Sequence, residues 1–186
     1  CPYIRMRATI PVSVKDCWDF LRVHNWDESM PQMDPFYEGV SVHSNYTTHP
    51  KVDMLLCRKR LKRIFTFGKR DLVFLSVTED EPLTDGTWVS GTVSVHTSLL
   101  PRQPGYVRAF QDSVAFYKPI VDKNHTALTI VCRIDLNDSS NGGGSSGWIP
   151  MWFYVKTIGY TGVQSFLRMR KALIQAAEVA DFSNTA

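Results

Sequence analysis

The clearest hydrophobic pattern in the chain is an alternation of apolar and polar residues near its C-terminal third. Side chains point to opposite faces at successive positions of a strand, so such an alternation gives one apolar face and one polar face. The polar face carries Thr129, Arg133 and Asp135. The apolar face carries Leu128, Ile130, Cys132, Ile134 and Leu136. Residues 126–136 are therefore predicted to form a strand of an antiparallel sheet with one buried and one solvated face.

Similar patterns, with many Val and Thr residues, predict more strands near residues 3–10, 37–44, 51–58, 71–78, 87–97 and 106–118. Turn residues separate the later ones, including Thr84-Asp85-Gly86 and the cluster of Pro101, Pro104 and Gly105. Ser13 is a suitable N-cap for a short helix that ends near Leu21. Residues 22–36 are predicted to be irregular because Pro31 and Pro35 interrupt longer elements.

A long C-terminal helix is predicted from Pro150, which suits the first helical position, to about residue 180. Gly159 and Gly162 in its middle favour a bend. Apolar or small residues recur in steps of three or four and form one continuous stripe. The stripe consists of Met151, Val155, Ile158, Gly162, Phe166, Met169, Leu173 and Ala177.

Antiparallel strands followed by one long amphipathic helix predict an α+β fold. The stretch 137–147, rich in Gly, Ser and Asn, is a loop within one domain that spans residues 1–186, because too few residues follow it to form a second core. A curved sheet that wraps the helix imperfectly leaves an apolar cavity. Periodicity alone favours the simpler interpretation that the helix stripe fills the core by ordinary packing.

Composition excludes several classes of protein. Hydrophobic residues make up 44% and charged residues 21%, and the net charge is +3, without the basic stripe of a nucleic-acid binder. No apolar run approaches the roughly 18 residues that span a membrane, and no signal peptide is visible. Because the chain begins at Cys1, we expect it to be part of a longer protein.

The reactive side chains do not form a recognisable catalytic or metal motif. The four cysteines make no CxxC pair, and Cys57 and Cys132 lie in apolar strand patterns typical of buried free thiols in a reducing compartment. The five histidines belong to no nucleophile or zinc motif. We therefore expect no cofactor, no metal and no catalysis, although an active site built from distant residues is left open.

Five short motifs, in order along the chain, resemble those of START (StAR-related lipid transfer) domains. The first is Lys69-Arg70-Asp71-Leu72-Val73-Phe74-Leu75-Ser76-Val77, followed by a strand from Thr87-Trp88 to Ser94-Val95. Gly105-Tyr106-Val107-Arg108-Ala109 and Gly147-Trp148-Ile149-Pro150 come next, and Phe166-Leu167-Arg168 is the last. The resemblance covers nearly the whole chain.

The resemblance implies a helix-grip fold: a curved antiparallel sheet closed by the long C-terminal helix around a hydrophobic tunnel. It implies binding of one lipid (a phospholipid, sterol, ceramide or fatty acyl type) for transfer between membranes. The alternative is a lipid-sensing regulatory module of a larger protein such as an acyl-CoA thioesterase, whose START domains have a stretch similar to Pro82–Gly86. The chain departs from the family in two ways. The N-terminal helix and the first two strands that family members usually have are absent. Ser76 stands where sterol and phosphatidylcholine carriers often have a basic residue, and Lys69 stands where ceramide carriers have a glutamine, so neither headgroup contact is carried over.

Site residues are predicted from this resemblance. The tunnel lining is expected to include Trp88, Phe110, Val114, Phe116, Ile130, Cys132 and Ile134 on strands. On the helix it is expected to include Met151, Tyr154, Val155, Ile158, Val163 and Phe166. The gate, which would also contact the membrane, is expected to contain Ile64, Phe65 and Phe67.

Charged residues are predicted to be mainly structural. Arg70 and Asp71 are interpreted as a pair that pins a loop, with a headgroup contact as the alternative, and Arg108 as pointing outward or pairing with a carboxylate. The basic cluster from Arg58 to Arg63 is interpreted as a solvated strand end, with contact to anionic lipids as the alternative. The expected protein is a cytoplasmic monomer that binds a small hydrophobic ligand, contacts membrane surfaces transiently and does not bind nucleic acid.

Overall fold

The structure is a computed structural model that describes residues 3–47, 51–63, 68–121, 124–136 and 151–183, with the backbone alone at 151–155, 157, 158 and 179–183. In chain order the first elements are β1 (Tyr3–Ile10), α1 (Val14–Leu21), the 3-10 helix η1 (Val23–Asn25), α2 (Trp26–Met33), β2 (Tyr37–Asn45) and β3 (Val52–Leu61). The remaining elements are β4 (Arg70–Glu79), β5 (Trp88–Ser94), β6 (Val107–Ile120), β7 (His125–Asp135) and α3 (Met151–Ser183). The predicted strands and the long C-terminal helix are confirmed, with boundaries shifted by a few residues.

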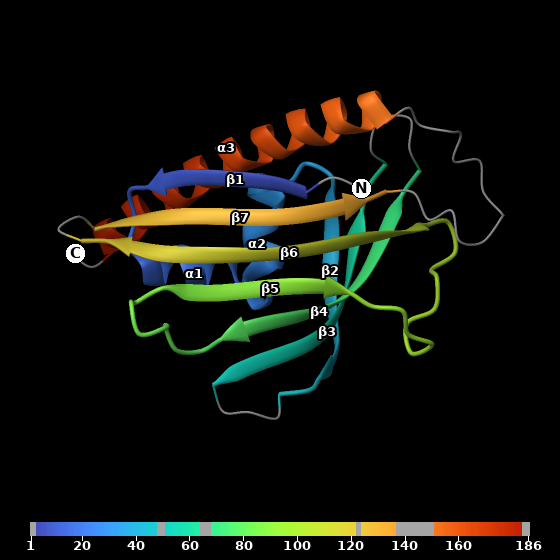
Figure 1. Ribbon diagram of the computed structural model, residues 1–186, viewed down its shortest axis with the longest axis horizontal. Helices are drawn as coiled ribbons and strands as arrows, with labels where there is room; N and C mark the ends of the chain where they lie inside the picture. Colours follow the sequence, from blue (N-terminus) through green and yellow to red (C-terminus); the bar gives the residue numbers. More distant parts are fainter. Residues whose placement is uncertain (1–2, 48–50, 64–67, 122–123, 137–150, 184–186) are drawn as a thin grey trace.

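The strands form one curved sheet in the order β1-β7-β6-β5-β4-β3-β2 (Figure 1). Strands that are neighbours in this order pair antiparallel. A short additional parallel pairing joins β4 to β6 from Arg70↔Val107 to Leu72↔Ala109. Two register shifts interrupt the β2–β3 pairing, and such bulges increase strand twist and bending. The sheet is curved but not closed, because β1 and β2 are its two edges.

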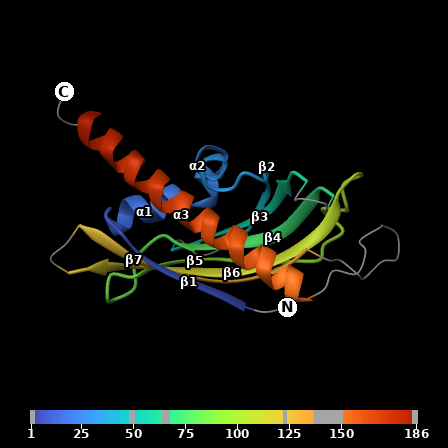
Figure 2. The same ribbon diagram turned by 90° about the horizontal axis from the view of Figure 1, so that it is seen from above.

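The helices lie together on one side of the sheet, where α3 crosses it diagonally (Figure 2). α3 has 33 residues, which corresponds to a length of about 50 Å. It contacts α2, β1 and α1, while α1 also packs on β6 and β7. The sheet and α3 therefore form two layers. α1 lies against both layers, and α2 lies against α3 and β2.

The two short helices show where local sequence signals succeed and fail. α1 begins as predicted, because the Ser13 side chain accepts a hydrogen bond from the backbone N–H of Asp16 at 3.1 Å. The prediction of irregular structure over 22–36 is wrong, since α2 occupies Trp26–Met33 with Pro31 inside it. Proline removes one backbone donor from a helix. α2 nevertheless forms, and it packs against α3 and β2.

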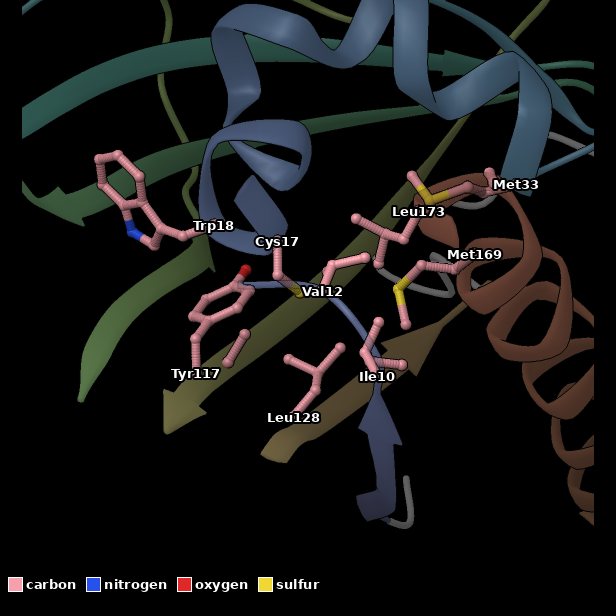
Figure 3. Packing of buried hydrophobic residues seen from close by; sticks show 11 residues of the cluster. Ile10, Val12, Cys17, Trp18, Met33, Tyr117, Leu128, Met169 and Leu173 are labelled. Carbon is pink, nitrogen blue, oxygen red and sulfur yellow. The ribbon is translucent and has the colours of Figure 1, made fainter. Parts of the chain in front are cut away.

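Two clusters of buried residues lie on the concave side of the sheet. The first joins β1, α1, β6 and β7 to the C-terminal half of α3, and Figure 3 shows Ile10, Leu128 and Met169 among its members pointing toward one another. The second joins β3, β4, β6 and η1 around Leu55, Leu72 and Phe74. A smaller cluster of Leu56, Val73 and Leu100 covers part of the convex face. The concave side is thus packed at two separate places, which leaves room between them.

Candidate functional site: a cavity between the sheet and α3

A cavity of about 290 Å³ lies on the concave side of the sheet. Its wall includes members of both core clusters, such as Tyr117 and Met169 from the first and Leu61 and Leu72 from the second. The cavity therefore occupies the space between the clusters. Its other described wall residues come from β1, α1, α2, β3, β5, β6, β7, the middle of α3 and the segments next to α2 and β7.

One wall of the cavity is built from small and polar side chains on β5 and β6. The inward positions of β6 are Gln111, Ser113, Ala115 and Tyr117, and β5 contributes Ser90, Gly91 and Thr92. These side chains pair across the two strands: Thr92 Oγ1 lies 2.8 Å from Ser113 Oγ, and Ser90 Oγ lies 3.1 Å from the Tyr117 hydroxyl. Ser113 and Ala115 on β6 and the three β5 residues are small, so they leave space between the sheet and α3.

The facing walls are mainly apolar. β7 contributes Ile130, Cys132 and Ile134. α3 contributes Phe166 and Met169, beside Thr161, Gly162 and Ser165. Two further methionines, Met30 and Met33, come from α2. Unbranched, polarisable methionine side chains adapt to ligands of irregular shape. An apolar cavity with a few polar groups on one side is typical of a small-molecule site.

The charged residues of the described cavity wall are Lys59 and Asp34. Lys59 is only 5% exposed, and its Nζ lies 3.4 Å from Asp34 Oδ2. The rings of Trp26 and Tyr37 flank the ammonium at 5.5 and 5.8 Å from their centroids. Asp34 ends α2 as its C-cap and accepts a hydrogen bond from the Phe36 backbone N–H at 2.9 Å.

Burial keeps the titratable groups of the β6 and β7 walls neutral. It raises the pKa of the Cys132 thiol above its usual value. It also raises the pKa of the Tyr117 hydroxyl, and the hydrogen bond with Ser90 only partly offsets that effect. Cys132 therefore behaves as a small apolar group rather than as a nucleophile.

Comparison of the sequence with protein-family models identifies the family of this chain. The model described as "START domain" matches residues 9–178, which is most of the chain. The chain belongs to the START domain family.

Solved structures with the same fold include two human proteins that resemble this START domain. Human StAR-related lipid transfer protein 5 has 19% identity and a TM-score of 0.75, over 94% of this chain and 76% of that one. Human STARD10 has 16% identity and a TM-score of 0.75, over 96% of this chain and 66% of that one. At such identities the likeness shows the fold. A search of curated protein sequences finds no significant match.

Four of the residues predicted to line the tunnel lie in the cavity wall of this START domain. They are Ile130, Cys132 and Ile134 on β7, where the sequence alternates cleanly, and Phe166 on α3. Their contact with a lipid remains a prediction.

Three predicted lining residues on β6 occupy the other face of the sheet. Phe110, Val114 and Phe116 alternate with the inward residues; Phe110 packs beside His96, and Phe116 is 39% exposed. The prediction chose the large apolar residues of this strand, whereas the cavity exists because the small ones point inward. The expected cavity position of these three residues is therefore wrong.

Two other predicted positions are corrected. Val163 is 54% exposed on the outer side of α3, because the helix turns the face of Gly162 and Phe166 toward the cavity. Trp88 is on the concave side but packs on Trp18, with ring centroids 4.4 Å apart, at the end of the first core cluster. The side chains of Met151, Tyr154, Val155 and Ile158, and the gate residues Ile64, Phe65 and Phe67, lie outside the described residues.

The predicted structural charges lie away from the cavity wall. Arg70 donates hydrogen bonds to the carbonyls of Leu136 and Gly68, at 2.9 and 2.8 Å. Asp71, which has no exposed surface, accepts two hydrogen bonds from Arg108. These contacts hold the start of β4 against the end of β7 and against β6.

Sequence reasoning missed Lys59. The strand β3 runs to Leu61, three residues beyond its predicted end, and its alternation divides the basic cluster between two faces. Lys59 points inward with Cys57 and Leu61, while Arg58 approaches Asp71 at 3.7 Å on the other face. The solvated interpretation is therefore wrong for these two residues, whereas Lys62 and Arg63 are exposed. The sequence did contain an indication of this burial. Lys59 is the one charged residue among the alternate, otherwise apolar positions Leu55, Cys57, Lys59 and Leu61.

Proposed function

We propose that this chain binds one lipid molecule in the cavity between its sheet and α3 and transfers it between membranes. The observation that carries the proposal is the apolar cavity in a START domain, bounded by Ile130, Cys132 and Ile134 on one side and by α3 on the other. Removing apolar surface from water is favourable by about 25 cal/mol per Å², so burial alone can retain such a ligand. Solved relatives of the same fold are named as lipid transfer proteins.

The chemistry of the wall supports binding rather than catalysis. Cys132 and Tyr117 are kept protonated by burial, which raises the pKa of each group. The polar pairs along β5 and β6 bond to each other, so they are suited to orient a ligand without reacting with it.

Membrane contact is supported by the outer face of α3. Tyr160, Val163 and Leu167 follow one another at helical spacing and are each more than half exposed. Residues 151–177 contain four Lys or Arg and no Asp or Glu, so this part of α3 is suited to an anionic surface. No helix in the described residues is long and apolar enough to cross a membrane.

The test is to purify the chain from cells, denature it and identify the released lipids by mass spectrometry. We expect one lipid class at close to one molecule per protein. If no lipid is released, and the protein takes up no sterol, phospholipid, ceramide or fatty acyl probe, the proposal fails. Exchange of the identified lipid between donor and acceptor vesicles then separates transfer, which requires release, from lipid sensing, which requires only retention.

A further inference from the structure

The buried lysine of the cavity wall has more hydrogen-bonding capacity than its surroundings satisfy. An ammonium carries three donors, and charge-assisted bonds to carboxylates are usually about 2.7–2.9 Å long. Among the described residues, the hydrogen bond of Lys59 Nζ is the one to Asp34, at 3.4 Å. The rings of Trp26 and Tyr37 also flank the ammonium, and they attract a cation but accept no strong hydrogen bond.

Asp34 is better satisfied than Lys59. Its other carboxylate oxygen already accepts the Phe36 N–H at 2.9 Å. Its side chain is 19% exposed and can be hydrated, whereas that of Lys59 is 7% exposed. A buried charge without full pairing is costly, so this part of the wall lacks an acceptor beside a cation.

The charged pair lies at one end of an elongated cavity. Across the sheet, Lys59 is opposite Leu72, which is opposite Ala109 on β6. The cavity then follows β6 from Gln111 to Tyr117, which belongs to the first core cluster. Six residues of strand correspond to about 20 Å. A volume of about 290 Å³ suits one hydrocarbon chain better than two.

We propose that the cavity selects a single-chain amphiphile with an anionic head, a carboxylate or a phosphate, which binds Lys59. The tail then runs along β6 and β7 toward Tyr117 and Met169. This inference rests on the proposed lipid-binding function and adds the charge of the head, its position and the number of chains.

The experiment measures the affinity of the delipidated protein for matched ligands by calorimetry. Oleic acid and oleyl alcohol share one tail and differ in the anion, while 1-oleoyl lysophosphatidic acid provides a phosphate head. Dioleoyl phosphatidic acid has that head with two tails. A hydrogen bond to a charged group contributes enough for an affinity difference of about 10- to 100-fold. We expect the protein to bind oleic acid or lysophosphatidic acid more tightly, by that factor, than oleyl alcohol and the two-chain lipid. Whichever of the two anions binds more tightly identifies the head as a carboxylate or a phosphate.

Variants assign the preference to Lys59. Lys59→Met keeps most of the length of the side chain and removes its charge, so we expect affinity for the anions to fall to that for oleyl alcohol. Lys59→Arg should keep most of the preference. The double variant Lys59→Met/Asp34→Asn removes the unpaired carboxylate and provides a folded protein if the single variant is unstable. Lys118→Met is the control, because Lys118 is exposed on β6 and pairs with Asp85 outside the cavity.

The outcomes separate the two proposals. Equal affinity for oleic acid, lysophosphatidic acid and oleyl alcohol, or an anion preference that survives in the double variant, overturns the role of Lys59 while lipid binding stands. Tight binding of dioleoyl phosphatidic acid overturns the single-chain part. If the wild-type protein binds none of these ligands and no other lipid, the proposed function fails as well.

Discussion

Arg108 holds the carboxylate of Asp71 with two hydrogen bonds, from Nε at 3.1 Å and from Nη2 at 2.9 Å. Asp71 has no exposed surface, and Arg108 also donates to the Leu100 carbonyl at 3.1 Å. Arg58 approaches the same carboxylate and donates to the Pro101 carbonyl. The ion pair therefore fastens the segment around residues 100–101 to the convex face of β3, β4 and β6, away from the cavity.

Replacing Arg108 with Met should destabilise the fold strongly. It leaves a buried carboxylate whose remaining cation among the described residues is Arg58, at 3.7 Å. Breaking a buried pair costs about 3–5 kcal/mol. Urea unfolding followed by fluorescence measures the free energy of unfolding. The double variant Arg108→Met/Asp71→Leu should recover much of the loss, and Lys51→Met, which breaks an exposed pair with Glu81, should change little. A double variant as unstable as the single one would contradict this account.

Leu173→Ala should loosen α3 from the sheet. Leu173 is 2% exposed in the first core cluster, and truncating such a residue costs about 2–5 kcal/mol. Leu167→Ala on the same helix, at a position 55% exposed, should change stability by less than about 0.5 kcal/mol. Chemical denaturation measures both, and hydrogen exchange should show faster opening of α3 in the first variant alone.

Cys132→Phe should block the cavity without disturbing the rest of the sheet. The added ring enters space that a ligand needs, so we expect ligand affinity to fall by roughly 10-fold or more, which is about 1.4 kcal/mol or more. Val131→Phe is the matched control, because the neighbouring residue points to the opposite face of β7 and does not line the cavity. Binding of the ligand identified by mass spectrometry is measured for both; equal losses would mean that the cavity is not the binding site.

Stability should fall at alkaline pH because buried thiols resist ionisation. Burial, assisted by the charge of Asp16, raises the pKa of Cys17 from 9.0 to about 12. The unfolded chain loses this proton at lower pH than the folded chain. The contribution is therefore complete below pH 9 and is lost as pH rises from 9 toward 12. The urea midpoint should fall less between about pH 8 and about pH 10.5 in Cys17→Ala than in the wild type. An identical fall in both proteins would contradict the prediction.

Vesicle binding should depend on the outer face of α3. The variant Val163→Ser/Leu167→Ser removes apolar groups that are 54% and 55% exposed, and we expect binding to anionic vesicles to weaken by roughly 10-fold. Leu99→Ser is the control, since Leu99 is 56% exposed in the segment between β5 and β6. Sedimentation with vesicles at low and high salt measures both contributions, because salt screens the attraction of the basic residues. Equal binding of all three proteins would remove α3 from the membrane contact.

Local patterns in the sequence predict the elements of this protein well. The alternation over 126–136 predicts β7 and, through Ile130, Cys132 and Ile134, one apolar wall of the cavity. The three- and four-residue steps after residue 150 predict α3, and Ser13 predicts the start of α1. These features depend on backbone geometry and neighbouring residues, which the sequence contains directly.

Which face of each strand points toward the helices was decided by the tertiary structure. In β6, Phe110 and Phe116 alternate with Ser113 and Ala115, and alternation alone does not distinguish the concave face from the convex one. Hydrophobicity favoured the phenylalanines, but a cavity requires small inward residues. Lys59 was hidden for a related reason: its burial depends on α2 and β2, which bring Trp26, Asp34 and Tyr37 around it. The sequence by itself determined the strands, the long helix and the family resemblance, because these depend on local periodicity and short motifs. The cavity and its charged end were decided only by the tertiary structure, because they depend on the curvature of the whole sheet and on the side that the helices cover.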